Sequence, residues 1–168
     1  GGGNVSDEKR FEHVVTLLPE IASYDVGTFN WLPGPIFDNT PDFLRKLGKV
    51  CIENNIKPEI EVFDASMITN AVFLQKKGVL KGPLQFNLVM NVPGSITGTP
   101  RNLQYLVDSL PEGSTWQVSG IGSSQVTLLT IAIAMGGNVR TGLEDLLTMS
   151  KGVPATNKML VERVLRIA

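Results

Sequence analysis

The stretch Gly136-Gly137-Asn138-Val139-Arg140-Thr141-Gly142-Leu143-Glu144-Asp145 places one cation and two carboxylates close together after a glycine pair. Its middle part, residues 138–142, is typical of a short β-strand. Ligands and catalytic groups of α/β proteins gather where strands end. Arg140, Glu144 and Asp145 are therefore candidates for metal binding, proton transfer and contact with an anionic substrate. On spacing alone, a surface ion-pair cluster at the start of a helix is the favoured interpretation.

Outward from this stretch, strand-like and helix-like segments alternate along the chain. Strands are predicted at 20–24, 58–63, 84–90, 115–119 and 138–142. Helices are predicted at 6–18, 43–53, 66–77, 102–110, 125–135 and 158–167, with a cap at Ser6 and a stop at Gly78. A long loop is expected through Trp31, Pro33 and Pro35. This order predicts one α/β domain, residues 1–168, with parallel strands and right-handed crossovers.

Composition limits the classes of function. The 168 residues are 42% hydrophobic and carry a net charge of −1, so neither nucleic acid nor an anionic membrane is an expected partner. No apolar run is long enough to span a membrane, and the N-terminus lacks a signal pattern, so we expect a cytoplasmic protein. The single cysteine, Cys51, excludes an internal disulfide and is expected to be a buried apolar side chain on a helix.

Several motifs, in order along the whole chain, carry a resemblance to a known family. They include Pro19-Glu20-Ile21-Ala22-Ser23, Pro58-Glu59-Ile60-Glu61-Val62, Val92-Pro93-Gly94, Gly120-Ile121-Gly122 and the stretch 136–145. The sequence resembles the C-terminal half of the β-keto acid cleavage enzymes. One departure is Ser123, which stands where the family often carries an arginine, so contact with coenzyme A there is not carried over.

The resemblance implies a partial TIM (β/α)8 barrel. Five predicted strands and 168 residues fall short of the eight strands and roughly 250 residues typical of that fold. The chain would hold strands 4 to 8 with their helices, beginning after strand three at Gly1-Gly2-Gly3. Open strand edges and a half-barrel interior favour a homo-oligomer or pairing with the missing barrel half. The chain is therefore interpreted as a fragment or one piece of a split barrel.

The resemblance also implies roles for individual residues. Glu144 would share a zinc ion with two histidines of a His-x-His motif that belongs to the missing part. His13, the one histidine present, lies within a predicted helix and cannot replace them. Asp145 would remove the acidic proton of the substrate, and Arg140 would orient Asp145. Ser23 keeps a hydroxyl where the family commonly has threonine, so it is a candidate for substrate binding.

Glu61 resembles a second acidic group of the proton-transfer set. It lies two residues after Glu59 on a predicted strand, so both carboxyl groups should share one face, and their closeness could raise one pKa. Trp31 is interpreted as a packing residue rather than a recognition element.

The implied reaction joins a β-keto acid with acetyl-CoA and gives acetoacetate and a new CoA thioester. Two alternatives remain open. The chain could be a non-catalytic, structural half-barrel, although such a remnant has no reason to keep Arg140, Glu144, Asp145 and Glu61 together. It could also belong to another metal-dependent aldolase or hydrolase that acts on keto acids.

Overall fold

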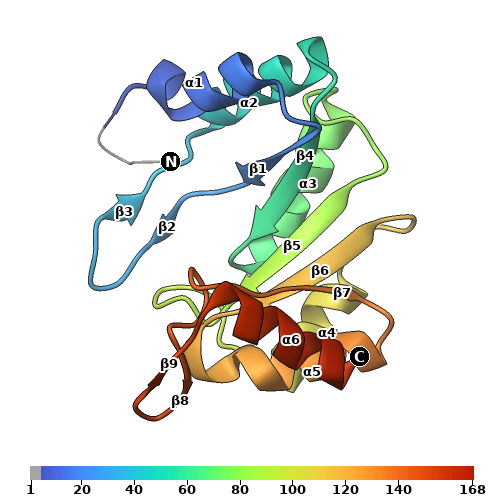
Figure 1. The fold of residues 1–168 in the computed structure, drawn as a ribbon. Helices are drawn as coiled ribbons and strands as arrows, with labels where there is room; N and C mark the ends of the chain where they lie inside the picture. The colour runs from blue at the N-terminus through green and yellow to red at the C-terminus, as the bar shows by residue number, and fades with distance from the viewer. Residues whose placement is uncertain (1–4) are drawn as a thin grey trace.

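A five-stranded parallel sheet organises the chain. The computed structural model describes residues 5–168, so the barrel boundary predicted at Gly1-Gly2-Gly3 lies outside the described part. The strands follow one another across the sheet in chain order (Figure 1): β1 (Ile21–Asp25), β4 (Lys57–Val62), β5 (Gln85–Met90), β6 (Thr115–Gly120) and β7 (Asn138–Arg140). All four pairings are parallel, as the alternating pattern predicts.

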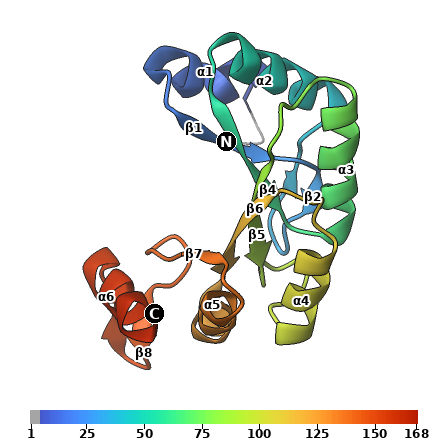
Figure 2. The ribbon, with the colours of Figure 1, turned by 90° about the vertical axis from the view of Figure 1, so that its right-hand side faces the viewer.

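Six α-helices connect or follow the strands: α1 (Asp7–Leu17), α2 (Pro41–Glu53), α3 (Ala65–Lys76), α4 (Pro100–Asp108), α5 (Gln125–Ala134) and α6 (Asn157–Ile167). A hydroxyl at the N-cap accepts a backbone N–H in α1, α2, α4 and α6, as expected for Ser6 in α1. Helices α1 to α5 follow an arc around the sheet (Figure 2), which is the arrangement of a segment of a (β/α)8 barrel.

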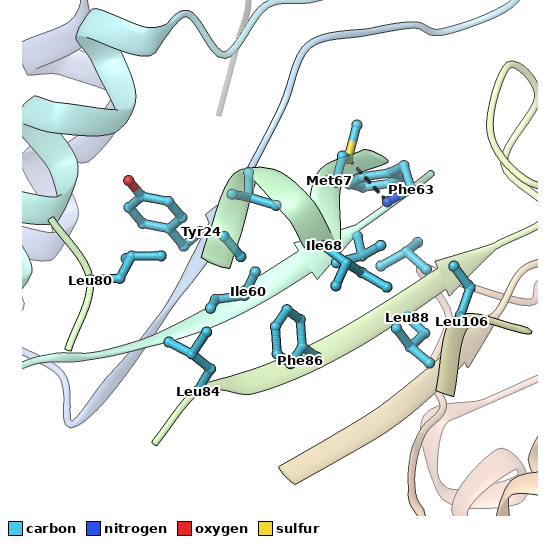
Figure 3. Close-up of a cluster of buried hydrophobic side chains, with 14 of the residues drawn as sticks. Tyr24, Ile60, Phe63, Met67, Ile68, Leu80, Leu84, Phe86, Leu88 and Leu106 are labelled. Carbon is cyan, nitrogen blue, oxygen red and sulfur yellow. Dashed lines mark hydrogen bonds between the residues drawn. The ribbon is translucent and has the colours of Figure 1, made fainter. Parts of the chain in front are cut away.

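The two faces of the sheet differ in chemistry. Side chains at even positions of the strands, such as Tyr24, Ile60 and Phe86, are fully buried. They pack with side chains of the helices, among them Met67 and Ile68 of α3 (Figure 3). Because side chains alternate between faces, the odd positions point to the other side. Most of these positions are polar: Ser23, Asp25, Glu59, Glu61, Asn87, Gln117 and Ser119. On β7, Arg140 pairs in register with Ser119 and shares this face.

Two short hairpins were not expected. The loop predicted through Trp31 contains β2 (Phe29–Asn30) and β3 (Ile36–Phe37), which pair antiparallel. A second pair, β8 (Thr148–Ser150) and β9 (Val153–Pro154), precedes α6. Strands of two or three residues are too short to show an alternating pattern, so the sequence did not indicate either pair. The predicted loop through Trp31, Pro33 and Pro35 is the turn of the first hairpin, and only its flanks form strands.

Two further expectations can be compared with the fold. Cys51 is buried in α2, as predicted. Across residues 5–168, the helices are too short or too polar to cross a membrane.

Candidate active site

A cavity of about 540 Å³ opens at the carboxyl ends of the parallel strands. It is lined by all of the residues that the sequence singled out: Ser23, Glu61, Arg140, Glu144 and Asp145. Ser23 comes from β1, Glu61 from β4, and Arg140 ends β7, while Glu144 and Asp145 follow β7 in the next loop. The parallel sheet therefore brings together residues that are up to 122 positions apart, from Ser23 to Asp145.

Arg140 is the centre of the charged cluster. Its Nη2 lies 2.7 Å from Oδ1 of Asp145, and its Nε lies 3.3 Å from Oδ2 of the same carboxylate. The same Nη2 is 3.2 Å from Oε2 of Glu144, whereas Nη1 is 3.6 Å from Oε1 of Glu61. Burial alone would lower the pKa of Arg140, but the three carboxylates together hold that pKa above its usual value.

The two neighbouring carboxylates meet different surroundings. The side chain of Asp145 is only 1% exposed, whereas that of Glu144 is 83% exposed. Asp145 is therefore held in a two-point ion pair shielded from solvent, which fixes its orientation. Glu144 also contacts Arg140, but most of its side chain is open to solvent and accessible to groups from outside the chain.

The loop that carries these carboxylates is anchored through its backbone. The N–H of Asp145 donates to the carbonyl of Gly142 at 3.0 Å, and the carbonyl of Asp145 accepts from the N–H of Gly122 at 2.8 Å. The amide oxygen of Asn157 accepts from the N–H of Leu143 at 2.9 Å. Contacts with the segments around Gly122 and Asn157 thus hold the loop that carries Asp145, and Asp145 itself has no positive φ.

Asp25 is a site residue that sequence reasoning missed. It is the last residue of β1, lines the same cavity and pairs in register with Glu61 of β4. The predicted strand ended at Tyr24, which left Asp25 outside the strand. The available signal was the spacing: Asp25 lies two residues after Ser23, on the same face of a strand.

The Asp25–Glu61 pair has the most perturbed acidity in the cavity. Burial, followed by the negative charge of Asp25, raises the pKa of Glu61 to about 8. Burial likewise raises the pKa of Asp25. Glu59 adds to the effect on Glu61 less than Asp25 does, so the predicted interaction between Glu59 and Glu61 exists but is the smaller one.

Below this pair, uncharged polar groups fill the inner face of the sheet. Nε2 of Gln117 donates to Oε1 of Glu59 at 3.0 Å, and the hydroxyl of Ser119 donates to Oδ1 of Asn87 at 2.8 Å. Asn87 is fully buried and pairs in register with Glu61. The floor of the cavity is therefore polar but brings no further cation close to Glu61.

Aromatic side chains form one wall of the cavity. The rings of Phe29 and Phe63 stack with centroids 4.4 Å apart, and Trp31 and Phe37 extend this wall along the β2–β3 hairpin. Trp31 is 48% exposed and contacts the ring of Phe37, with centroids 6.1 Å apart, so its interpretation as a packing residue stays a prediction. The carbonyl of Pro93 accepts from the N–H of Leu32 at 3.1 Å and ties the hairpin to the β5–α4 loop.

A metal site is not complete within this chain. No cluster of three or more His, Cys, Asp or Glu side chains able to hold a metal ion occurs among residues 5–168. Glu144 could contribute one oxygen ligand, but Arg140 is its only charged contact in the described chain. A catalytic zinc ion needs about three protein ligands, so the residues present do not by themselves fit one.

Known proteins share both the sequence and the fold. The chain is 46% identical to 3-keto-5-aminohexanoate cleavage enzyme of Acetoanaerobium sticklandii, a match that covers 100% of this chain and 62% of that protein. It is 34% identical to 3-dehydrocarnitine:acetyl-CoA trimethylamine transferase of Rhizobium meliloti, over 95% of this chain and 53% of that protein. The chain thus spans less than two thirds of the length of these relatives.

A solved structure supports the partial barrel. The apo structure of ObcA superposes with a TM-score of 0.67 at 24% identity, covering 89% of this chain and 40% of that chain. This likeness, together with the five parallel strands and their outer helices, confirms the predicted fold class. The family model described as beta-keto acid cleavage enzyme matches residues 1–168. The chain belongs to the β-keto acid cleavage enzyme family.

Proposed function

We propose that the enzyme carrying this chain condenses a β-keto acid with acetyl-CoA and releases acetoacetate and a new CoA thioester. One observation carries the proposal: Arg140 gathers Asp145, Glu144 and Glu61 in a cavity at the strand ends of a barrel segment. The names of the relatives support it, since one cleaves 3-keto-5-aminohexanoate and another uses acetyl-CoA as a co-substrate.

The reaction is balanced without a redox step. Loss of a proton from the carbon between the keto and carboxylate groups gives a carbanion, which attacks the carbonyl carbon of the acetyl thioester and expels the CoA thiolate. The thiolate then attacks the keto carbon, and breaking the original bond between the keto carbon and the central carbon releases acetoacetate as a carbanion. The keto side of the substrate leaves as the acyl group of the new CoA thioester, and the proton returns at the end.

Asp145 is the proposed base. Its carboxylate is oriented by Arg140, and its Oδ2, held at 3.3 Å, is bound less tightly than Oδ1 at 2.7 Å. Oδ2 is therefore the oxygen proposed to take the substrate proton. Because the ion pair fixes the carboxylate before substrate arrives, little reorganisation is needed when the proton moves.

Ser23 and Glu61 are proposed to position the substrate. Ser23 is exposed on the inner face of β1 and lines the cavity, so its hydroxyl can hydrogen-bond a keto or carboxylate oxygen. Glu61 has a pKa of about 8, so near pH 7 its carboxyl group mostly holds a proton and can donate a hydrogen bond.

Glu144 is proposed as the contribution of this chain to a zinc ion whose other ligands lie outside it. Its exposed carboxylate can reach a metal without leaving Arg140 unpaired, since Asp145 keeps the stronger contact. We further propose that residues 1–168 form one partial barrel domain. Its open strand edges would associate with a second chain segment or a second copy. No catalytic step is assigned to the metal.

The test is a turnover assay on the complete barrel, with acetoacetate measured in the presence and absence of acetyl-CoA. Asp145→Asn should lose nearly all turnover and keep its metal content, whereas Glu144→Gln should lose metal and activity together. Glu20→Gln is the matched control, because Glu20 is exposed outside the cavity. Cleavage of the keto acid without acetyl-CoA would instead support an aldolase or hydrolase. Loss of metal in Asp145→Asn but not in Glu144→Gln would reverse the two roles.

A further inference from the structure

The cavity gathers more negative charge than its one arginine can balance. Asp25, Glu61, Glu144 and Asp145 all line it, and Arg140 is the cation among the lining residues. Arg140 directs Nε and Nη2 to Asp145 and shares Nη2 with Glu144, which leaves only Nη1, at 3.6 Å, for Glu61. The contact with Glu61 exceeds hydrogen-bond length, so among residues 5–168 the nearest cation to Glu61 is held at ion-pair distance only.

The strand register places a second carboxyl group, that of Asp25, next to Glu61. Asp25 and Glu61 are partners in the β1–β4 pairing, and side chains of register partners stand next to each other on one face of the sheet. The side chain of Glu61 is 11% exposed, and Asp25 is partly buried. Two adjacent carboxylates shielded from water cannot both ionise near neutral pH without a large electrostatic cost.

We infer that Asp25 and Glu61 share one proton, and that Asp25 is thereby a positioning residue that keeps the charge of the pair at a single negative unit. This inference rests on the proposed function: the pH at which the pair loses its shared proton is the pH above which the cavity disfavours an anionic β-keto acid. When the shared proton leaves, a second negative charge appears beside the substrate, and binding of the anion weakens.

The groups that face the pair are consistent with this assignment. From β4 itself, Glu59 adds negative charge and favours the proton; from β7, Arg140 opposes it. Glu61 and, to a smaller extent, Arg10 of α1 lower the pKa of Asp25. From β5, the register partner of Glu61 is the uncharged amide of Asn87. Burial raises the pKa of both members. Two carboxyl groups that interact strongly release their protons as a pair rather than independently.

The direct test is a carboxyl ¹³C NMR titration of the native protein with labelled Asp and Glu. In the wild type, we expect the Glu61 carboxyl carbon to titrate near pH 8 and the Asp25 carbon to respond in the same step. Asp25→Asn should lower the Glu61 titration by at least about one pH unit, because the negative neighbour is gone. Glu59→Gln is the matched control on the same strand face and should lower it by less.

A reciprocal variant protects the test against a folding defect in Asp25→Asn. In Glu61→Gln, the Asp25 carbon should titrate in a single step, without the second step that it shares with Glu61 in the wild type, because its partner can no longer exchange a proton. Burial still raises the pKa of Asp25 in this variant. An unchanged Glu61 titration in Asp25→Asn, or equal shifts in Asp25→Asn and Glu59→Gln, would overturn the inference. Two titration steps for the Asp25 carbon in Glu61→Gln would overturn it as well.

Kinetics separate this inference from the proposed function. The wild-type KM for the β-keto acid should rise about tenfold as the pair loses its proton above pH 8, whereas the KM of Asp25→Asn should stay flat there. A purely structural role for Asp25 would lower activity at every pH without changing this profile. If the protein has no acetyl-CoA-dependent activity, the proposed function fails, and the NMR titration still decides whether the pair shares a proton.

Discussion

Replacing Arg140 by Met should destabilise the fold through the buried carboxylate that it leaves behind. The Asp145 side chain is 1% exposed and receives two contacts from Arg140, at 2.7 and 3.3 Å. Removing one partner of such a buried pair costs about 3–5 kcal/mol, because the remaining charge keeps its desolvation penalty without compensation. Met preserves much of the length of the arginine stem, so packing loss contributes little to that cost.

A double-mutant cycle isolates the interaction. Asp145→Asn removes the charge that Arg140→Met leaves unpaired, so the double variant should be more stable than the sum of the single losses predicts, by about 2 kcal/mol or more. The control is Lys49→Met, which breaks an exposed ion pair with Glu53 at 3.7 Å. That loss should stay below about 1 kcal/mol.

The assay is urea unfolding at pH 7 followed by circular dichroism, with the same slope required for all variants so that midpoints can be compared. Losses of the two single variants that add within about 0.5 kcal/mol would refute the reasoning. The same conclusion would follow if Lys49→Met cost as much as Arg140→Met, since burial would then have no influence.

Three further outcomes are expected. Because the folded-state pKa of Glu61 is raised from 4.5 to about 8, the folded protein binds more protons than the unfolded chain between these values. Stability should therefore fall as pH rises through this window, by about 1.4 kcal/mol per pH unit and at most roughly 5 kcal/mol, and Glu61→Gln should reduce this slope in urea unfolding measured from pH 5 to 9. Gly94→Ala should cost at least about 1–3 kcal/mol and shift the fluorescence of Trp31, because φ is +95° and a Cβ would lie 1.7 Å from the carbonyl oxygen of Asn30; unchanged emission would argue against a hairpin held by this contact. The isolated 168-residue chain should lose zinc to a mild chelator, since Glu144 alone cannot form a specific site, and stoichiometric zinc after dialysis would show that the ligands are misplaced.

Local chemistry explains why the main elements could be predicted. The Ser6 hydroxyl accepts a hydrogen bond from the N–H of Lys9 at 3.4 Å, and Gly78 follows α3 with a φ of +72°. Each of these two helix boundaries therefore depends on a single residue that can be recognised in the sequence. The β2–β3 hairpin depends instead on distant partners. Phe29 stacks on Phe63, and the N–H of Leu32 donates to the carbonyl of Pro93. The sequence around Phe29 and Leu32 gives no sign of these distant contacts.

The site divides in the same way. Arg140 and Asp145 are five positions apart, so their ion pair could be anticipated from spacing. Glu61 joins them only because the sheet order places β4 and β7 around one cavity, and the family resemblance supplied what spacing could not. Asp25 escaped both routes, since it lies one residue past the predicted strand and its pKa is raised by burial, which only the folded structure shows.

The alternation of polar and apolar positions in β4 has a consequence for assembly of the sheet. If β4 slid by a single residue against β1, Ile60 would face the cavity and Glu59 and Glu61 would enter the layer beneath the helices. Two carboxyl groups would then sit among aliphatic side chains, at a cost of several kcal/mol each. The acidic residues of β4 therefore also disfavour a shifted alignment of the strands. A variant with apolar residues at both positions would lose this protection against misaligned pairing.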